Sequence, residues 1–359
     1  MQPSKMDAIV DKITRWIGAP ESDTETSFDE LAIELFHYQF AHNMAYQNYC
    51  RALGIDTAEQ ISSWRDIPAV TTDVFKLAAH NPSSVDITSC NHVFHTSGTT
   101  GESFGCHYFP SLDIYESSIL SAWHELDQPA ISQPLIFTKN HSLSPHSSLV
   151  HMFECLRRSY AANTDDSIYL IDGDGQLDVD AVRRAAASDK PVSLLGTALA
   201  FLHLFQLMEK SGDSFTLPAG SWALETGGYK GSQFSLSKEE LYALFAEKLG
   251  LQPDQLVNEY SMTELSSQFY TRGIGNAHCG PRWTRTRVID PNTGAEVAQG
   301  ELGYLVIYDL ANVHSVSAIR TQDLAISCGE NQFILIGRDP SALPRGCSRS
   351  AQESLQAAK

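Results

Sequence analysis

Short apolar runs and helix-like stretches alternate through the chain, and this alternation constrains the fold more than any other feature. Runs of β-branched and apolar residues, typical of buried strands, occur at 134–138, 167–171, 191–196, 221–225 and 304–310. Stretches with helical spacing separate several of these runs, at 179–187, 198–211 and 238–249. Strand–helix alternation over this length predicts an α/β protein with a largely parallel sheet.

A capping signal predicts a further helix near the N-terminus. Ser27 precedes the run FDELAIELFHYQFAHNMAYQNYCRAL, whose apolar residues recur at helical spacing. Glu30 stands three residues after Ser27, as in a capping box, where each side chain bonds the other residue's backbone N–H. We therefore predict one long helix that starts at Phe28.

The charge balance excludes one broad class of partner. The 359 residues carry a formal net charge of −18, whereas binding to nucleic-acid phosphates needs a basic surface. Hydrophobic residues make up 42% of the chain, which is typical of a globular protein and sufficient for a large core. The sequence has no stretch of about 18 uninterrupted apolar residues, so it predicts no membrane span.

The cysteine pattern indicates a reducing compartment. The seven cysteines are odd in number, scattered and never spaced as CxxC, which disfavours both a disulfide framework and a zinc knuckle. The N-terminal segment MQPSKMDAIVDKITRW is polar and amphipathic, without the apolar centre of a signal peptide. We therefore expect a cytoplasmic protein.

The segment HTSGTTGESFG (95–105) is rich in hydroxyl residues and glycine. Many donors on a freely turning backbone are suited to wrapping an anion, although the same composition is common in polar surface turns. Neither glycine is followed by lysine, so a Walker-type phosphate loop is excluded, and the pattern GxGxxG is absent as well. The loop needs corroboration from the rest of the chain.

That corroboration comes from a resemblance. TSGTTG (96–101) resembles the phosphate-loop signature of the adenylate-forming superfamily, whose members use ATP to convert a carboxylate into an acyl-AMP with release of pyrophosphate. Further segments resemble the family's motifs in the same chain order: GSWALETGGYKG (220–231), NEYSMTELSS (258–267), SAIRTQDLA (317–325) and GRDPSALPRGCS (337–348). The resemblance implies the N-terminal domain fold of these enzymes, with ATP and Mg²⁺ as cofactors.

The resemblance also assigns nucleotide contacts. The phosphate loop would comprise Thr96, Ser97, Gly98, Thr99, Thr100 and Gly101. The turn at Gly227 and Gly228 would pack against adenine, and Tyr260 would offer its ring for stacking, worth about 1–3 kcal/mol if it behaves like other base stacking.

The remaining contacts implied by the resemblance concern the phosphates and the ribose. Thr263 would bond the α-phosphate, and Glu264 would hold Mg²⁺, which offsets triphosphate charge. Asp323 would accept hydrogen bonds from the ribose hydroxyls, and Arg338 would pair with the same nucleotide. Taken singly, each residue has a purely structural alternative, as a core tyrosine, a helix cap or a solvated carboxylate. Taken together, they favour the nucleotide site.

Departures from the superfamily pattern narrow the choice of branch. Only a short tail follows Arg338, so we expect no mobile lid domain and no catalytic lysine from one. In addition, ESFG replaces the usual PKG, and Gln322 stands where glycine is usual. The short tail and ESFG resemble the LuxE family of acyl-protein synthetases (long-chain fatty acid–protein ligases), as do FDELAIELFHYQF, IPAVTTDVFK, SSLVHM, DLANV and LPRGCS. We expect an adenylate-forming core over residues 1–336 and a hinge-derived tail over residues 337–359.

The LuxE resemblance implies an acid–thiol ligase with two half-reactions. A fatty or other carboxylic acid becomes an acyl-AMP, and the acyl group then passes to a cysteine of the enzyme as a thioester, for delivery to a partner acyl reductase. The matching cysteine is Cys347 in RGCS. Arg345 and Arg349 flank it, and neighbouring cations lower the pKa of a thiol and so favour the reactive thiolate. The alternative is an incidental thiol.

Two further candidates stay open. Lys230, in GGYKG, could bind a phosphate or the acyl carboxylate in place of the absent lid lysine, or it could be an ordinary surface lysine. His151, in SSLVHM, could orient the substrate carboxylate or be a satisfied core histidine. Lys76 in VFK is a weaker candidate.

The segment IDGDGQLDVD (171–180) lacks the glycine and glutamate of a calcium loop, and we predict a turn followed by an aspartate helix cap.

Two other functions compete with the acyl-protein synthetase. The first is an acyl-CoA ligase of the phenylacetate–CoA ligase type, although the missing lid counts against it. The second is a non-catalytic partner subunit that binds nucleotide, which the departures at Gln322 and ESFG leave open.

Overall fold

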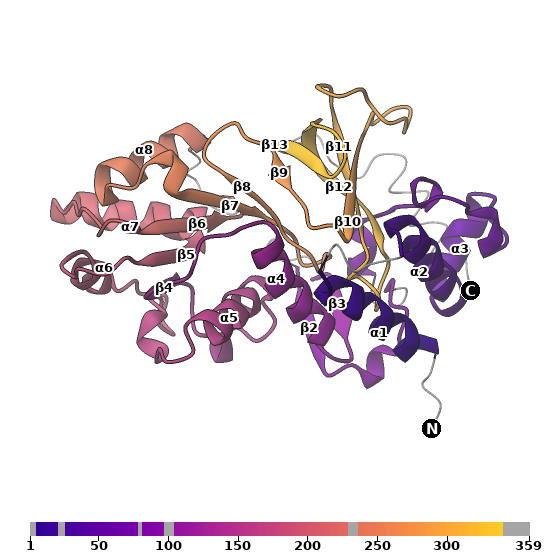
Figure 1. Cartoon of the computed structure of the whole chain (residues 1–359), viewed down its shortest axis with the longest axis horizontal. Coiled ribbons are helices and arrows are strands. Elements are labelled where there is room, and N and C mark those ends of the chain that lie inside the picture. The colour runs from indigo at the N-terminus through magenta and orange to yellow at the C-terminus, as the bar shows by residue number, and fades with distance from the viewer. Residues whose placement is uncertain (1–4, 21–25, 78–80, 97–103, 229–235, 340–359) are drawn as a thin grey trace. The chain divides into compact units, whose positions relative to one another are not determined.

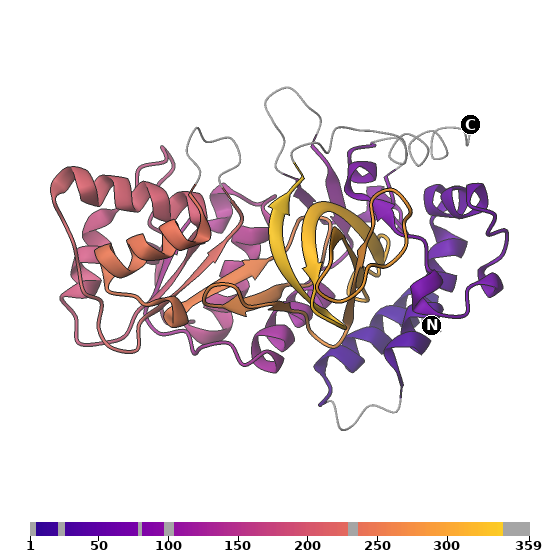
Figure 2. The ribbon, with the colours of Figure 1, turned by 90° about the horizontal axis from the view of Figure 1, so that it is seen from above.

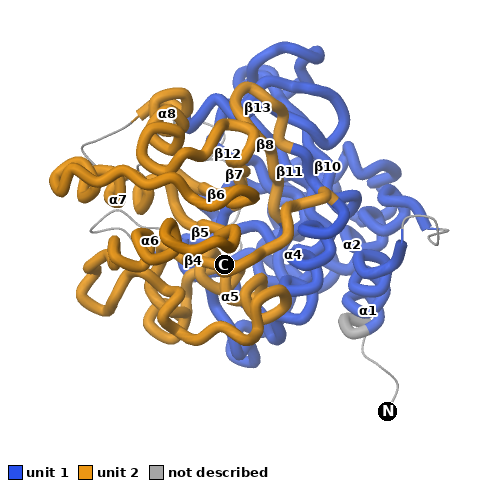
Figure 3. Tube along the Cα trace, turned by 60° about the vertical axis from the view of Figure 1, so that its left-hand side comes forward, with its two compact units in different colours: residues 1–125, 262–267, 279–359 blue, residues 126–261, 268–278 orange. Residues whose placement is uncertain are grey.

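The structure is a computed structural model that describes residues 5–20, 26–77, 81–96, 104–228 and 236–339. The chain divides into two compact units, coloured separately in Figure 3. Unit 1 comprises Met1–Glu125, Met262–Ser267 and Cys279–Lys359, and unit 2 comprises Leu126–Ser261 and Gln268–His278. Each unit is described separately below.

Unit 2 is built on a parallel sheet, as the alternating pattern predicts (Figure 1). The parallel strands run in the order β4 (Pro134–Phe137), β5 (Ser193–Thr197), β6 (Trp222–Thr226) and β7 (Leu256–Tyr260). Strand β8 (Phe269–Arg272) pairs antiparallel with β7. The α/β fold class and the strands expected at 134–138, 191–196 and 221–225 are confirmed.

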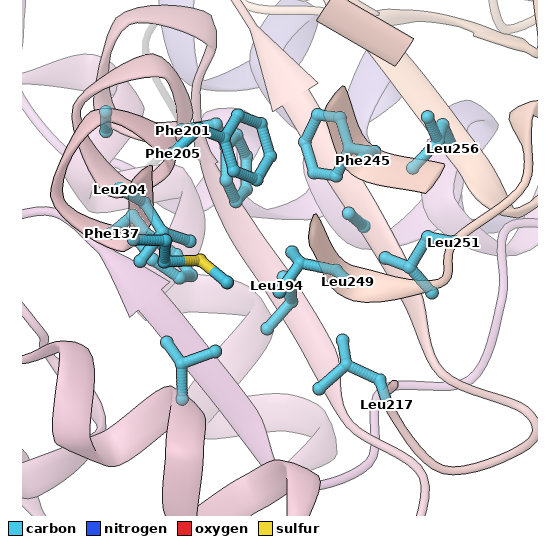
Figure 4. Close-up of a cluster of buried hydrophobic side chains, with 14 of the residues drawn as sticks. Phe137, Leu194, Phe201, Leu204, Phe205, Leu217, Phe245, Leu249, Leu251 and Leu256 are labelled. Atoms are coloured by element: carbon cyan, nitrogen blue, oxygen red, sulfur yellow. The ribbon is translucent and has the colours of Figure 1, made fainter. Parts of the chain in front are cut away.

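Helices of unit 2 cover its sheet and close a buried apolar cluster (Figure 4). Helices α6 (Val179–Ala186), α7 (Ala198–Ser211) and α8 (Lys238–Leu249) contribute residues to this cluster, whereas α5 (Ser148–Tyr160) contributes none. Phe201 of α7 packs between Phe137 and Phe245, with ring centroids 4.8 Å apart in each pair. Because all three rings are buried, truncating one of them to alanine would cost about 3–5 kcal/mol of stability.

The strand predicted at 167–171 is wrong. A 3₁₀ turn spans Asp166–Ile168, and Tyr169 makes only an isolated parallel bridge to Ile136. The carboxylate of Asp165 accepts the backbone N–H of Ser167 at 2.9 Å, and this local bond favours a turn over a strand. The prediction for 171–180 is confirmed, since Asp178 caps α6 by accepting the N–H of Ala181.

Unit 1 carries the N-terminal helices. They are α1 (Lys5–Gly18), α2 (Phe28–His42), α3 (Met44–Ala52) and α4 (Asp113–Glu125). The capping box of Ser27 and Glu30 is confirmed, but the single long helix is wrong. The helix breaks at Asn43, whose extended backbone ends α2 and whose side chain caps α3 by accepting the N–H of Tyr46 at 3.0 Å.

The sheet of unit 1 is mostly antiparallel, unlike that of unit 2. Its antiparallel strands are β10 (Thr284–Ile289), β11 (Leu302–Asp309), β12 (Ala318–Ser327) and β13 (Gln332–Arg338). The short strand β1 (Val70–Thr71) pairs parallel with β12, and a 3₁₀ turn (Thr72–Lys76) follows it. The predicted strand at 304–310 corresponds to β11. The last strands, yellow in Figure 2, are strongly curved.

A separate hairpin of unit 1 carries the ends of the glycine-rich loop. Strand β2 (His92–His95) pairs antiparallel with β3 (Cys106–Phe109). The short strand β9 (His278–Cys279) lies where the chain passes from unit 2 to unit 1. Among the helices described here, none combines the length and the apolar character that crossing a membrane requires.

Candidate active site

The base of the glycine-rich loop is closed by reciprocal hydrogen bonds. The Thr96 N–H donates to the Gly105 carbonyl at 2.9 Å, and the Gly105 N–H donates to the Thr96 hydroxyl oxygen at 2.9 Å. Thr96 is buried, so the structure uses its hydroxyl to hold the loop base. The loop residues Ser97, Gly98, Thr99, Thr100 and Gly101 lie outside the described residues.

The segment 262–267 of unit 1 lies beside this loop base. The Thr263 hydroxyl donates to the carbonyl oxygen of His95 at 3.3 Å, and His95 directly precedes Thr96. Tertiary structure therefore brings the hydroxyl predicted to contact the α-phosphate next to the loop predicted to cradle phosphates, although 167 positions separate Thr96 from Thr263 (263 − 96).

Glu264 is a buried carboxyl among charged neighbours. Burial raises its pKa to about 7, because an ionised carboxylate loses hydration in the interior. Its own backbone N–H and the positive charges of Arg338 and Lys76 act in the opposite direction, whereas Asp73 raises the pKa further. The predicted Mg²⁺ ligand is therefore a carboxyl whose pKa a nearby cation would lower, so that the carboxyl loses its proton.

Side chains around Glu264 form a polar chain. The Gln322 amide donates to Asp73 Oδ2 at 3.0 Å, and its oxygen accepts a hydrogen bond from Arg338 at 2.5 Å. Asp73 also pairs with Lys76, whose Nζ lies 3.7 Å from Asp73 Oδ1. We call Asp73, Lys76, Gln322 and Arg338 the polar chain. Gln322, a departure from the superfamily pattern, connects the Asp73–Lys76 pair to Arg338.

Asp323 and Arg338, the residues predicted to bind ribose and nucleotide, are brought together in unit 1. They are cross-strand partners in the β12–β13 ladder. The Asp323 N–H donates to the hydroxyl of Thr321 at 3.1 Å, which fixes the backbone of β12 at this point. Arg338 is exposed and Asp323 half-buried, so the pair is accessible at the end of β13.

The candidates in unit 2 gather at the carboxyl edge of its parallel sheet. Gly227 directly follows β6 with φ +67°, a left-handed conformation that favours glycine, and Gly228 follows it; both are exposed. Tyr260 ends the neighbouring strand β7 and is buried, with its ring 6.1 Å from that of His278. The edge of an open parallel sheet at which its strands end is a common ligand site.

The other predicted residues are less constrained by the structure. His151 lies in the first turn of α5 and is half-buried. Lys230 and Cys347 lie outside the described residues, so their roles stay predictions.

The sequence reasoning gave no role to two buried carboxyls of unit 2. Glu225 accepts hydrogen bonds from Lys238 and, at 3.0 Å, from the Tyr242 hydroxyl; burial raises its pKa and Lys238 lowers it. Glu259 accepts from the Thr226 hydroxyl, and burial raises its pKa to about 7. Both residues lie inside motifs named in the sequence analysis: Glu225 directly precedes TGG, and Glu259 directly precedes Tyr260. These positions were the signal in the sequence that could have identified them.

The donor set around Glu264 is consistent with Mg²⁺ held together with a nucleotide. Among the described residues, no group of three or more His, Cys, Asp or Glu side chains forms a metal cage. Mg²⁺ commonly binds through one or two carboxylates, with substrate phosphates and waters as the other ligands. A single buried carboxyl beside a phosphate-loop base fits this mode.

Comparisons with known proteins identify the family of this chain. A family profile described as "Acyl-protein synthetase, LuxE" matches residues 158–356, more than half of the chain. The long-chain-fatty-acid–luciferin-component ligase of Aliivibrio fischeri is 25% identical over 309 residues, covering 83% of this chain and 78% of that protein.

The fold is shared with a solved ligase structure. An open conformation of 2-hydroxyisobutyryl-CoA ligase, in complex with 2-HIB-AMP and CoA, has a TM-score of 0.61 and 15% identity, covering 89% of this chain and 76% of that chain. ATP-bound MatB from Rhodopseudomonas palustris has a TM-score of 0.48 and 15% identity, covering 78% of this chain. The chain spans about half the length of MatB, with 52% of it covered.

The expected adenylate-forming fold and the expected family are thus both confirmed. The chain belongs to the LuxE family of acyl-protein synthetases, which are acid–thiol ligases.

Proposed function

We propose that this protein activates a fatty acid with ATP and Mg²⁺, forming an acyl-AMP and releasing pyrophosphate. The observation that carries the proposal is the buried Glu264 carboxyl, which lies near the charges of Lys76 and Arg338 in a chain of the LuxE family. The neighbouring Thr263 hydroxyl is held at the base of the glycine-rich loop. Together these groups provide a carboxylate that can bind Mg²⁺, and cations and a hydroxyl that can bind phosphate.

The charges of the site fit a nucleotide triphosphate. Arg338 and Lys76 supply positive charge near Glu264, and either would lower the electrostatic cost of bringing phosphates to a chain of net charge −18. Bound Mg²⁺ would offset phosphate charge and polarise the α-phosphoryl group. The adenine contacts assigned to Gly227, Gly228 and Tyr260, and the ribose contact of Asp323, belong to the same proposal.

The second half-reaction in this proposal transfers the acyl group to Cys347. The thiolate attacks the acyl carbonyl carbon, a C–S bond forms, the bond to the phosphate oxygen breaks, and AMP leaves. The acyl group of this thioester is then transferred to a nucleophile of a partner acyl reductase or of another acceptor in the cytoplasm; the C–S bond breaks, and the Cys347 thiol is restored. The printed name of the Aliivibrio relative, a long-chain-fatty-acid ligase, supports a fatty acid as the substrate.

Labelled fatty acid and ATP test both steps. The wild type should catalyse ATP–pyrophosphate exchange that depends on the acid, and should acquire a label that hydroxylamine removes. Cys347→Ser should abolish the label and keep the exchange. Cys328→Ser is a matched control, because Cys328 is a half-buried thiol of the same unit, and this variant should retain both activities.

Other results would favour the competing functions. Label that appears only on coenzyme A would favour an acyl-CoA ligase. Absence of exchange across acids of different chain length would contradict adenylation and favour a nucleotide-binding partner subunit.

A further inference from the structure

His107 occupies a buried position beside the segment that carries Thr263 and Glu264. It lies in β3 and is 1% exposed. Its Nδ1 lies 2.9 Å from the carbonyl oxygen of Thr263, and its Nε2 lies 3.0 Å from the hydroxyl of Ser315. Both ring nitrogens therefore have partners within unit 1.

These partners assign the tautomer of the ring. A carbonyl oxygen only accepts hydrogen bonds, so Nδ1 must carry the proton and donate to Thr263. Nε2 is then an acceptor, and the Ser315 hydroxyl donates to it. Burial lowers the pKa of His107 to about 3, which keeps the ring neutral near pH 7 and leaves this tautomer as the only one that satisfies both contacts.

Aromatic rings pack against the imidazole of His107. The ring centroid of Phe109 lies 4.2 Å away and that of Phe75 lies 5.4 Å away. Burying an imidazole among aromatic rings costs free energy unless its polar atoms are hydrogen-bonded. The histidine is therefore explained by its two hydrogen bonds and not by packing alone.

Other buried side chains hold the same segment at its next residues. The Asn312 amide donates to the Glu264 carbonyl at 2.8 Å. The carboxylate of Asp309 accepts the Ser266 N–H at 2.9 Å and the Ser267 hydroxyl at 2.7 Å. Residues 264, 266 and 267 are thus tied to the end of β11 and the loop that follows it, whereas His107 ties residue 263 to the hairpin that carries the glycine-rich loop.

We propose that His107 is a positioning residue for adenylation, which fixes the backbone of Thr263 and Glu264 relative to the β2–β3 hairpin by donating from Nδ1. This inference rests on the proposed function. An error of about 1 Å in the placement of a catalytic group can lower a rate by about 100-fold, so a single lost backbone contact is sufficient to be measured.

Two amide substitutions at His107 distinguish a role in positioning Thr263 from a role in filling the buried space alone. His107→Asn places an amide N–H near the position of Nδ1, so it keeps the bond to Thr263 and loses the contact with Ser315. His107→Gln places its amide near the position of Nε2, so it keeps the contact with Ser315 and loses the bond to Thr263. We expect kcat for ATP–pyrophosphate exchange to remain within about 3-fold of wild type in the first variant and to fall about 10- to 100-fold in the second.

The KM for the fatty acid and the melting temperature complete the test. Positioning predicts that His107→Gln lowers kcat and leaves this KM within about 2-fold of wild type, since the acid contacts neither His107 nor Ser315 in the proposal. Equal kcat in the two folded variants would overturn the inference, whatever their melting temperatures. Absence of exchange in the wild type would instead overturn the proposed function and this inference with it.

A measurement on the wild type decides the matter if His107→Gln does not fold. Nitrogen-15 spectra of the histidine rings distinguish a protonated Nδ1 from a protonated Nε2, and the signals of His107 are identified by their loss in His107→Asn. Protonation at Nδ1 from pH 6 to 8 supports the inference. Protonation at Nε2 contradicts it, because the ring then has no proton to donate to Thr263.

Discussion

Asp323 and Arg338 stand directly opposite each other on neighbouring antiparallel strands, β12 and β13. Opposed residues in such a ladder have their Cβ atoms about 4.5–5.5 Å apart. The strand register therefore sets the spacing between the carboxylate proposed to bind ribose and the guanidinium proposed to bind the same nucleotide. Arg338 is also tied to Asp73 through Gln322, so one ladder position links the ribose and phosphate sides of the proposed site.

Replacing Arg338 tests one of the two cations of the polar chain. We expect Arg338→Ala to raise the KM for ATP about 10-fold, since hydrogen bonds between charged groups contribute about 1.5–3 kcal/mol and this one is exposed. The measurement is ATP–pyrophosphate exchange at varied ATP. Arg272→Ala removes another exposed strand arginine, in unit 2, and should leave this KM unchanged. Equal effects of the two substitutions would contradict a specific role for Arg338.

Gln322 is expected to position Arg338. We predict that Gln322→Ala raises the KM for ATP about 3- to 10-fold and leaves stability within about 1 kcal/mol of wild type, because the side chain is half-buried and bonds charged groups. Gln299→Ala is the control: it removes an exposed glutamine of unit 1 that donates to the Cys328 carbonyl. An unchanged KM in Gln322→Ala would show that Arg338 needs no such support.

The raised pKa of Glu264 makes stability depend on pH. In the folded chain its pKa is raised from 4.5 to about 7, so the folded state binds more protons between these values and this group's contribution to stability is lost as pH rises. Glu264→Gln does not titrate. The melting temperature of this variant minus that of wild type should therefore increase from pH 5 to pH 8 in the absence of nucleotide.

The difference between variant and wild type isolates Glu264. Burial also raises the pKa values of Glu259, to about 7, and Asp309, to about 6, but both residues are common to the two proteins. Addition of ATP and Mg²⁺ should raise the melting temperature of wild type more than that of Glu264→Gln, because the amide is a poorer Mg²⁺ ligand. Parallel pH curves for the two proteins would show that Glu264 is ionised throughout.

The base of the glycine-rich loop has no room for an additional methyl group at Gly105. A Cβ there would lie 2.8 Å from Thr96 Cγ2 and 3.0 Å from its hydroxyl oxygen, and Thr96 is buried and β-branched. We expect Gly105→Ala to destabilise the protein by about 1–3 kcal/mol, as overpacking does, and to weaken ATP binding. Urea unfolding and nucleotide titration measure the two effects.

A second substitution checks the cause. Thr96→Ser removes Cγ2 and keeps the hydroxyl that accepts the Gly105 N–H, so the double variant Thr96→Ser/Gly105→Ala should recover much of the lost stability. If the double variant does not regain stability, the strain caused by Gly105→Ala lies elsewhere in the hairpin.

Local patterns in the sequence predicted much of unit 2 and the motifs of the site. Helices α6, α7 and α8 and strands β4, β5 and β6 follow from periodicity and capping, which depend on neighbours within a few residues. The phosphate-loop segment, Thr263, Glu264, Asp323 and Arg338 were found by their motifs. The sequence did not predict the break between α2 and α3 at Asn43, because the apolar spacing continues across it. Only the backbone conformation of Asn43 and its capping side chain reveal two helices.

Packing between segments that are distant in the sequence determined which residues lie next to those motifs. Residues 70–76 and 318–338 meet in unit 1 because β1 pairs with β12 and β12 pairs with β13 in one particular register. Residues 264, 266 and 267 are held by hydrogen bonds to Asp309 and Asn312. A shift of register by one residue would turn each side chain to the other face of the sheet, and no local propensity specifies that register. Lys76 near Glu264 and Gln322 between Asp73 and Arg338 depend on this long-range pairing, whereas His107 contacts Thr263 from the separate β2–β3 hairpin. All of these neighbours are far apart in the sequence, which is why the sequence identified the chemical groups and the folded chain determined their partners.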